Sequence, residues 1–342
     1  MPVAFISGIS GQDGALLAEY LLSLGYKVAG SSRAPKNAEN LWRLERLKIK
    51  HLVNVVGSEV SKPHLIDQFL PDELYNLEGQ SSVAESFRSP HDTIVSNGIS
   101  TVDWLEAIRL SERPIRFYQA SSAEIFGASE DFSRGEASPV HPRSPYAVSK
   151  LFSHYLTVNY REAYNIFACC GILFNHESPL RGSQFVTQKI ARSVAQWSCG
   201  QREPLQVGNI HVKRDWGHAK DFVRGMHAML QQPRAEDFVL ATGILHSVRD
   251  FIEAAFRVID IDLIWQGEGL DEKAYDKKSA VLCVQVDARF YRPSDMDQSL
   301  GNPIKARNVL KWIPEVIFEK VVEEMVQSHL NNSATSSSKK DC

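Results

Sequence analysis

The chain has 342 residues, of which 43% are hydrophobic and 23% charged, and its formal net charge is -3. This length exceeds what one small core serves, so we expect one large domain plus a smaller one, and a small scaffold is excluded. The balanced charge argues against nucleic acid or an anionic membrane as the main partner. Five cysteines with no Cys-x-x-Cys pair and no Cys/His cluster argue against a disulfide framework, and no metal site is expected.

The first residues carry no signal for secretion. An apolar run at residues 3–7 follows the first methionine directly, without a basic segment or a small-residue cleavage site. No apolar segment approaches the roughly 20 residues that a membrane-spanning helix needs. We therefore expect a cytoplasmic protein with no membrane association.

Short apolar runs alternate with longer helical patterns through the first half of the chain. The predicted strands cover residues 3–7, 26–31, 52–56, 73–77, 115–120 and 168–174. Helical spacing lies between them, for example at residues 15–22 and 102–109. This alternation is typical of stacked βαβ units, so we predict an α/β fold with a Rossmann-like, doubly wound parallel sheet.

The pattern changes after residue 175. Isolated helices, loops rich in Gly, Pro, Arg and Asp, and short strands such as 238–241 and 281–286 follow. We expect residues 1–175, with later returning segments, to form the Rossmann domain and residues 176–330 mainly to form a smaller lobe. Residues 331–342 lack apolar side chains that could hold them down, so we predict a disordered tail there.

A glycine loop follows the first predicted strand and opens the first predicted helix. Gly8, Gly11 and Gly14 let the backbone turn tightly and approach a pyrophosphate, while the helix N-terminus supplies free N–H groups. The alternative is an ordinary glycine turn. Because strand, loop and helix occur together, the sequence favours a dinucleotide as ligand.

Arginine follows the second predicted strand. An acidic residue usually binds the free 2'-hydroxyl of NAD about 20 residues beyond such a loop, whereas this sequence has Arg33 there. A guanidinium suits a 2'-phosphate, so NADP is favoured over NAD. A solvated surface arginine remains the alternative.

Tyr146 and Lys150 are four residues apart in a predicted helix, so both side chains lie on one helical face. A lysine ammonium and an oxidised nicotinamide nearby would stabilise the tyrosine phenolate and make it a usable base. Ser122 and Glu124 follow the strand at 115–120, and the ligand crevice of a parallel sheet lies at that end. Ser122 could bond a substrate oxygen and Glu124 could transfer a proton, although a turn serine and a helix-start glutamate would also explain them.

With these motifs in place, the sequence resembles the extended short-chain dehydrogenase/reductase superfamily, and within it the GDP-mannose 4,6-dehydratase family. The resemblance runs from about residue 3 to residue 326. The segments that carry it are residues 8–14, 142–150, 159–165, 171–179, 213–219 and 289–293. The first two occur in many sugar-nucleotide enzymes, whereas the later ones are closer to the dehydratases.

The resemblance implies roles for individual residues. Ser122, Glu124 and Tyr146 would be catalytic, and Lys150 would hold the nicotinamide ribose. Contacts to the cofactor NADP are implied for Gly8, Ile9, Ser10, Gly11, Gln12, Asp13, Gly14, Arg33, Leu77, Gln80, Ser81, His176 and Arg181. Contacts to the diphosphate of a GDP-sugar are implied for Asn175, Lys189, Arg214 and Arg289. The first domain would then bind NADP and the second lobe the sugar nucleotide.

The implied reaction is a redox-neutral loss of water that converts GDP-mannose to GDP-4-keto-6-deoxymannose. The resemblance also implies a homodimer or homotetramer, since helices matching residues 101–111 and 146–164 commonly pair between subunits in this superfamily.

Several positions depart from the family pattern. Ser122 replaces a threonine, Ser58 an acidic residue, Glu78 a small residue and Asp92 a tyrosine, and the loop at 34–42 also differs. Glu78 could repel a phosphate or bind a ribose hydroxyl. These changes leave three alternatives open: a GDP-heptose 4,6-dehydratase, another NADP-dependent epimerase or reductase, and a non-catalytic NADP-binding protein.

Overall fold

The computed structural model describes residues 1–127, 133–291 and 297–337, and the chain divides into two compact units. The first unit contains residues 1–174, 219–243 and 301–314. The second contains residues 175–218, 244–300 and the chain from residue 315 onward. Residues 292–293 of the segment 289–293 and residues 338–342 of the predicted tail lie outside the described residues.

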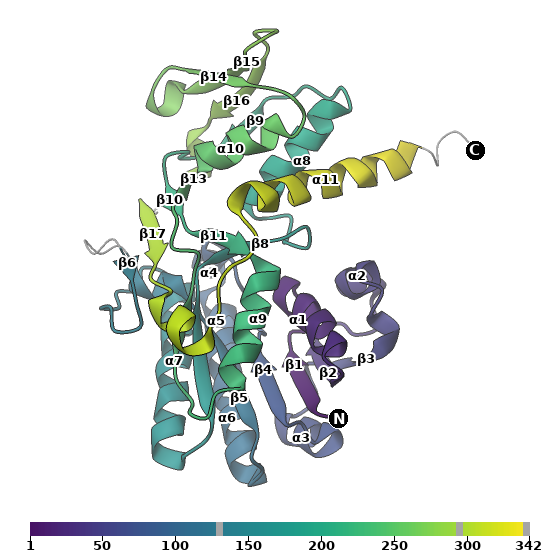
Figure 1. Ribbon diagram of the computed structural model, residues 1–342, viewed down its shortest axis with the longest axis vertical. Coiled ribbons are helices and arrows are strands. Elements are labelled where there is room, and N and C mark those ends of the chain that lie inside the picture. The colour runs from purple at the N-terminus through teal and green to yellow at the C-terminus, as the bar shows by residue number, and fades with distance from the viewer. Residues whose placement is uncertain (128–132, 292–296, 338–342) are drawn as a thin grey trace. The chain divides into compact units, whose positions relative to one another are not determined.

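A seven-stranded sheet, parallel throughout, forms the centre of the first unit (Figure 1). In spatial order its strands are β12 (Phe238–Leu240), β7 (Ala168–Leu173), β5 (Arg116–Ser122), β4 (Glu73–Asn76), β1 (Val3–Ser7), β2 (Lys27–Ser32) and β3 (Val53–Gly57). The chain winds outward from β1 in one direction and from β4 in the other. The predicted doubly wound sheet is confirmed, and its switch point lies between β1 and β4, where such sheets bind ligands.

The strand expected at residues 238–241 was wrongly assigned to the smaller lobe. β12 pairs with β7, with Phe238 opposite Gly171, and therefore belongs to the first sheet. Helix α9 (Ala219–Leu230) precedes it and makes the crossover that a further parallel strand requires. Sequence order suggested the second lobe, but the chain returns to the first unit for this helix and strand.

Helices cover both faces of this sheet. Phe5, Leu74 and Phe117 pack with α3 (Lys62–Phe69) and α6 (Ser100–Ser111) in one core. Because strand side chains alternate, Ile6 and its neighbours face the other layer, where α1 (Gln12–Ser23) packs against α9. The remaining elements of this unit are α2 (Ala38–Arg46), η1 (Lys50–Leu52), α4 (Val83–Arg88), α5 (Pro90–Ile94), η2 (Val95–Ile99), η3 (Ala123–Phe126), β6 (Ser133–Arg134), α7 (Pro145–Tyr164) and η6 (Ala306–Leu310).

The second unit has its own sheet and its own core. The sheet contains β14 (Leu263–Gln266), β15 (Lys273–Asp276), β16 (Leu282–Val286) and β9 (Leu205–Val207). Its core joins this sheet to α8 (Val186–Ser198), α10 (Val248–Arg257) and α11 (Phe318–Ser337) through buried side chains such as Trp197, Phe256 and Met325. The other elements are β8 (Asn175–Glu177), β10 (Lys213–Arg214), β11 (Trp216–His218), β13 (His246–Ser247), η4 (Gly269–Asp271), η5 (Ala288–Phe290) and β17 (Gln298–Gly301).

The predicted disordered tail is wrong for residues 331–337. These residues continue α11, which ends at Ser337. The helix is nucleated by its packed first part, around Val321 and Met325. Each further turn then adds a hydrogen bond per residue without a new nucleus, so polar residues can extend it. Within the described ranges, no helix combines the length and the apolar character needed to cross a membrane.

Candidate active site

The glycine loop turns tightly at the N-terminus of α1. Gly8 has a φ of 81°, and a Cβ there would lie 2.9 Å from the backbone of Leu77 and Glu78. A Cβ on Gly14 would lie 2.4 Å from the carbonyl oxygen of Gly8. No side chain caps the helix at Gly11. The loop therefore needs glycine for its own packing and presents the positive end of a helix to a phosphate.

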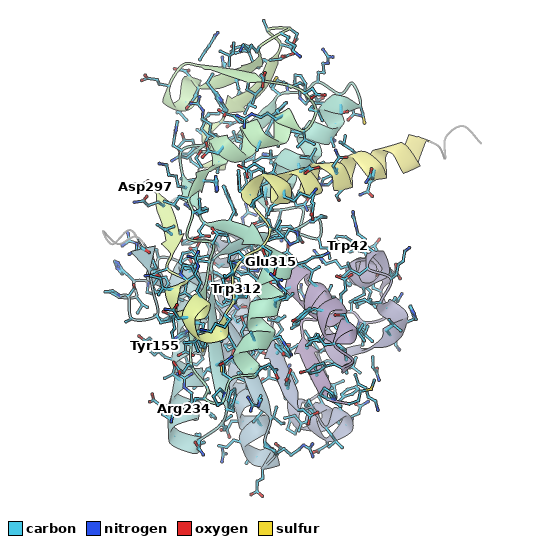
Figure 2. The ribbon with its side chains drawn as sticks, in the orientation of Figure 1. Trp42, Tyr155, Arg234, Asp297, Trp312 and Glu315 are labelled. Carbon is cyan, nitrogen blue, oxygen red and sulfur yellow. The ribbon has the colours of Figure 1, made fainter. Side chains whose placement is uncertain are left out.

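Polar groups gather where β2 ends, next to this loop. The hydroxyls of Ser10 and Ser32 are 2.9 Å apart, and exposed Arg33 follows directly. Arg43 of α2 donates to the carbonyl oxygen of Ser10 at 3.0 Å and packs over the ring of Trp42, which Figure 2 labels on this helix. Sequence reasoning missed Arg43. Its only signal was a basic residue in the helix that follows β2, and only the fold shows that it returns to the glycine loop.

The segment after β4 is tied to α7 through Asn97, a second residue that sequence reasoning missed. Asn97 Oδ1 accepts from the backbone N–H of Gln80 at 2.9 Å, and its Nδ2 donates to the carbonyl of Gln80 at 3.1 Å. The same Nδ2 donates to Ser149 Oγ of α7 at 3.0 Å. Leu77 and Ser81 flank this anchor. The π-turn η2 presents Asn97 in this way, and no periodicity in the sequence predicts such a turn.

Glu78 is neutralised by a neighbouring lysine. Its Oε1 accepts from Lys62 Nζ at 3.0 Å and from Trp104 Nε1 at 3.2 Å. The side chains of Lys62 and Glu78 are only 10% and 14% exposed. The positive charge of Lys62 therefore compensates the carboxylate of Glu78. It offsets the repulsion that the carboxylate alone would exert on a phosphate.

Ser122 and Glu124 lie at the carboxyl end of β5. Ser122 is its last residue, is 8% exposed, and its Oγ accepts from the backbone N–H of Glu124 at 3.3 Å. That hydrogen bond caps the short helix η3. Ser122 is thus the N-cap of η3, and its hydrogen bond holds Glu124 at the end of the strand.

Tyr146 and Lys150 occupy the first turns of α7. Ser144 caps this helix by accepting from the N–H of Ala147, and Pro145 takes its first position. Tyr146 is 8% exposed and Lys150 is 7% exposed, and the Lys150 ammonium lies 6.0 Å from the centre of the Tyr146 ring. Because α7 contacts both β5 and η3, the fold brings the four predicted catalytic residues to one end of one strand.

Burial changes the acidity of Lys150. Loss of solvation lowers the pKa of its ammonium to about 8, although the negative charges of Asp13 and Glu78 oppose this shift. The ammonium also donates to the carbonyl oxygen of Ala120 at 3.0 Å. At neutral pH the lysine is thus a buried cation beside Tyr146, and such a cation favours the phenolate form.

In the second unit, two predicted cations lie around one aromatic ring. Lys189 Nζ is 3.5 Å from the ring centre of Phe290, and burial lowers the pKa of this lysine. Arg289 is 75% exposed and donates to Asp287 and to Gln206 Oε1, the latter at 3.0 Å. The pair of cations and the exposed ring form a surface suited to a phosphate and a base, provided that Arg289 exchanges its carboxylate partner.

Four further predicted residues lie on short strands or their loops in the second unit. Asn175 and His176 belong to β8, which pairs with β11. Arg181 lies 3.3 Å from Glu177 and 3.6 Å from the ring of Phe185. Arg214 is buried in β10.

A doubly wound sheet with a glycine loop at its switch point and a Ser, Tyr and Lys set at the end of β5 defines the class of extended short-chain dehydrogenase/reductase proteins. A family profile described as GDP-mannose 4,6 dehydratase matches residues 5–325. The chain belongs to this family.

Curated relatives match this chain over almost their whole length. GDP-mannose 4,6 dehydratase of Dictyostelium discoideum is 44% identical over 95% of this chain and 94% of its own. The Sinorhizobium fredii enzyme of that name is 44% identical, covering 96% of this chain and 97% of its own. The human one is 42% identical, with 95% and 91% covered.

Solved structures share the fold at lower identity. RMD from Pseudomonas aeruginosa, complexed with NADPH, has a TM-score of 0.75 at 21% identity and covers 97% of this chain and 100% of its own. The dTDP-glucose 4,6-dehydratase from Bacillus anthracis, in complex with NAD, has a TM-score of 0.78 at 19% identity, with 98% of both chains covered.

Proposed function

We propose that this protein is a GDP-mannose 4,6-dehydratase. The observation that carries the proposal is the set of Ser122, Glu124, Tyr146 and Lys150, assembled at the end of β5 in a chain that matches curated dehydratases over nearly its whole length. A proton acceptor for an alcohol, a cation to stabilise it and a separate carboxylate are the groups that oxidation followed by elimination requires.

NADP is the proposed cofactor, and the residues present fit it. The loop of Gly8, Gly11 and Gly14 would receive the pyrophosphate, since it places Gly11 at the N-cap of α1, where the helix presents free N–H groups. Arg33 and Arg43 would bind the 2'-phosphate beside Ser32. When bound there, NADP would supply reversible hydride transfer, and the overall reaction would be redox-neutral.

The protein's own residues move the protons. Tyr146 Oη, as phenolate stabilised by the Lys150 ammonium, takes the proton from O4, and Ser122 Oγ donates a hydrogen bond to the same oxygen. The ketone formed at C4 makes the C5 proton acidic. The Glu124 carboxylate then removes that proton and assists the departure of the C6 hydroxyl as water. Tyr146 supplies the closing proton at C5, because it still holds the proton taken from O4 whereas the proton on Glu124 has left with the water.

The second unit would bind the GDP portion of the substrate. Lys189 and Arg289 would bind the diphosphate, because both are cations beside the exposed ring of Phe290. Arg289 is already paired with Asp287, so a phosphate must displace that carboxylate. Asn175 and Arg214 would add polar contacts from the neighbouring short strands. His176 and Arg181 are proposed to contact NADP.

The first experiment is to incubate the purified protein with GDP-mannose, and separately with GDP-manno-heptose, with NADP+ in catalytic amount. Loss of one water from GDP-mannose, detected by mass spectrometry without added reductant, is the expected result. Loss of water from GDP-manno-heptose alone would mean that the heptose, not GDP-mannose, is the substrate. If neither sugar loses water and Tyr146→Phe behaves like the wild type, the dehydratase proposal fails and an epimerase, a reductase or a non-catalytic NADP-binding protein replaces it.

We also propose a homodimer as the basic assembly, through an exposed apolar face on neighbouring helices of the first unit. Helix α7 contacts both α5 and η2. Their exposed apolar residues are Ile94, Val95, Ile99, Val148, Phe152 and Tyr155, the last of which Figure 2 labels. Such a contiguous face is typical of protein interfaces. Phe152→Glu should shift the mass measured by light scattering from dimer to monomer, whereas Ile264→Glu in the second unit should not.

A further inference from the structure

The catalytic face of α7 continues one turn beyond Lys150. Tyr146, Lys150 and His154 are spaced four residues apart and therefore lie along one side of the helix. His154 Nδ1 lies 3.2 Å from Ser121 Oγ on β5. Ser121 directly precedes Ser122, so this bond links the catalytic helix to the strand at the residue next to the proposed catalytic hydroxyl.

A fixed carboxylate lies at the other side of the imidazole. Asp237 Oδ2 is 4.0 Å from His154 Nε2. Both oxygens of Asp237 accept from Arg161 at 2.8 Å, and Oδ1 also accepts from the backbone N–H of Cys170 at 2.7 Å. Asp237 is thus anchored to α7 through Arg161 and to β7 through Cys170, and it cannot turn away from His154 without breaking these bonds.

This environment selects one form of His154. Its side chain is 12% exposed, and burial lowers its pKa even though the charge of Asp237 opposes that shift. The neutral ring has one N–H, and the carboxylate favours that hydrogen on Nε2. Nδ1 is then an acceptor for the Ser121 hydroxyl. The hydrogen bond is therefore donated by Ser121 on β5 and accepted by His154 on α7.

At least two side-chain hydrogen bonds connect α7 to β5: Lys150 to the carbonyl of Ala120, at 3.0 Å, and Ser121 to His154. Under the proposed function Lys150 also has to bind the nicotinamide ribose and stabilise the Tyr146 phenolate. His154 has no such second task, so its tether persists through the reaction.

We propose that His154 is a positioning residue, which holds α7 against β5 so that Tyr146 Oη and Ser122 Oγ reach the same substrate oxygen. This inference rests on the proposed function. It concerns the alignment of two catalytic groups on different elements, and misplacement of such groups by about 1 Å can cost on the order of 10²-fold in rate.

The test compares His154→Phe, which keeps a ring but removes both nitrogens, with His154→Asn, which keeps a polar atom near the position of Nδ1. For His154→Phe we expect kcat for dehydration to fall about 10-fold while KM for GDP-mannose changes less than about 2-fold, because alignment is lost and binding is not. His154→Asn should recover most of kcat. Ser121→Ala should match His154→Phe, and the double variant should be no slower than either single one.

A matched control separates alignment from general loss of stability. Thr157→Val removes another buried hydrogen bond of α7, from Thr157 Oγ1 to the carbonyl of Ser153, and keeps both partners of the His154–Ser121 hydrogen bond. It should lower the melting temperature but leave kcat unchanged. An unchanged kcat in His154→Phe, additive losses in the double variant, or an equal kcat loss in Thr157→Val would each overturn the inference.

A binding measurement tests the positioning role of His154 even if the proposed function is wrong. If the wild type dehydrates neither sugar nucleotide, the function is wrong and the tether is judged by fluorescence titration with NADPH. Because Lys150 shares the helix face of His154, His154→Phe should then weaken NADPH binding about 3-fold or more while Thr157→Val does not. Equal affinities of all three proteins would reject the positioning role.

Discussion

The proposed catalytic residues of the first unit and the proposed substrate cations of the second unit are held in opposite ways. Tyr146 and Lys150 are 8% and 7% exposed, and each is fixed by a helix that packs against the central sheet. Arg289 is 75% exposed and is paired with a neighbouring carboxylate, Asp287. The first arrangement fixes the geometry of its side chains, whereas the second leaves a cation solvated and paired with Asp287.

This difference predicts where substitutions act. Groups with fixed geometry and a perturbed pKa act on the transition state, so their loss lowers kcat. Exposed ion pairs contribute little to stability, and a cation gains little binding free energy when it exchanges one anion for another. Removing such a cation should therefore raise KM and leave kcat unchanged.

The largest effect is expected for Tyr146→Phe. Removing the phenolic oxygen deletes the proposed base while keeping the ring that packs at the start of α7. We expect kcat to fall by about 10⁴-fold, the upper end for general-base catalysis. Product formation with GDP-mannose measures it. Tyr164→Phe, which changes an exposed tyrosine at the end of the same helix, is the control, and an active Tyr146→Phe variant would contradict the assignment.

Glu124→Gln should separate the steps of the reaction. The amide cannot remove the C5 proton, so we expect the overall kcat to fall about 10²-fold while oxidation at C4 continues. Mixing with GDP-mannose should then build up the near-ultraviolet absorbance of reduced nicotinamide, which the wild type does not accumulate. Glu162→Gln, on the exposed side of α7, is the control. Loss of that oxidation step together with elimination would place Glu124 elsewhere in the mechanism.

The pH dependence of kcat/KM should reflect the ionisation of Lys150. Burial lowers the pKa of its ammonium to about 8, against 10.5 for an ordinary lysine. In the free enzyme the cation that favours the Tyr146 phenolate is present below pH 8 and is lost as the pH rises through 8. We therefore expect kcat/KM to fall about 10-fold per pH unit above this value.

The same shift predicts a change in stability with the opposite sign. Between pH 8 and 10.5 the unfolded chain binds the proton and the folded chain does not, so the contribution of Lys150 to the free energy of unfolding rises with pH across that window. Lys150→Met should remove both dependences, as measured by kinetics and by denaturant titration. A profile of kcat/KM that stays flat to pH 10 would contradict the assignment.

The smallest effects are expected in the second unit. Arg289→Ala should raise KM for GDP-mannose about 5-fold and leave kcat unchanged, because it removes an exposed phosphate donor. Asp287→Asn removes the carboxylate that now holds Arg289 and should lower KM about 2-fold. Steady-state kinetics at two salt concentrations measures both. A loss of kcat in either variant would mean that this unit shapes the reacting groups as well, and would end the contrast drawn between the two units.

The central sheet and the placement of the proposed catalytic residues were predictable because they depend on local patterns. Strand and helix periodicities predicted β1 to β5 and β7 within two residues at each end. The spacing of Tyr146 and Lys150 on one helix face is a local property, and so is the position of Ser122 after a strand. Arg43, Asn97 and His154 escaped prediction because each acts on a residue at least 30 positions away, across elements whose order in space no local pattern reveals.

The sequence by itself determined the class of fold, the dinucleotide loop and the family, because glycine, helix spacing and strand ends act within a few residues of each other. Only the tertiary structure decided that Lys62 compensates Glu78, that β12 joins the first sheet and that His154 tethers α7 to β5. These depend on which segments meet in space, and in the case of β12 on the return of the chain from the second unit. The hydrogen bonds and ion pairs of buried groups form only once those partners are in place.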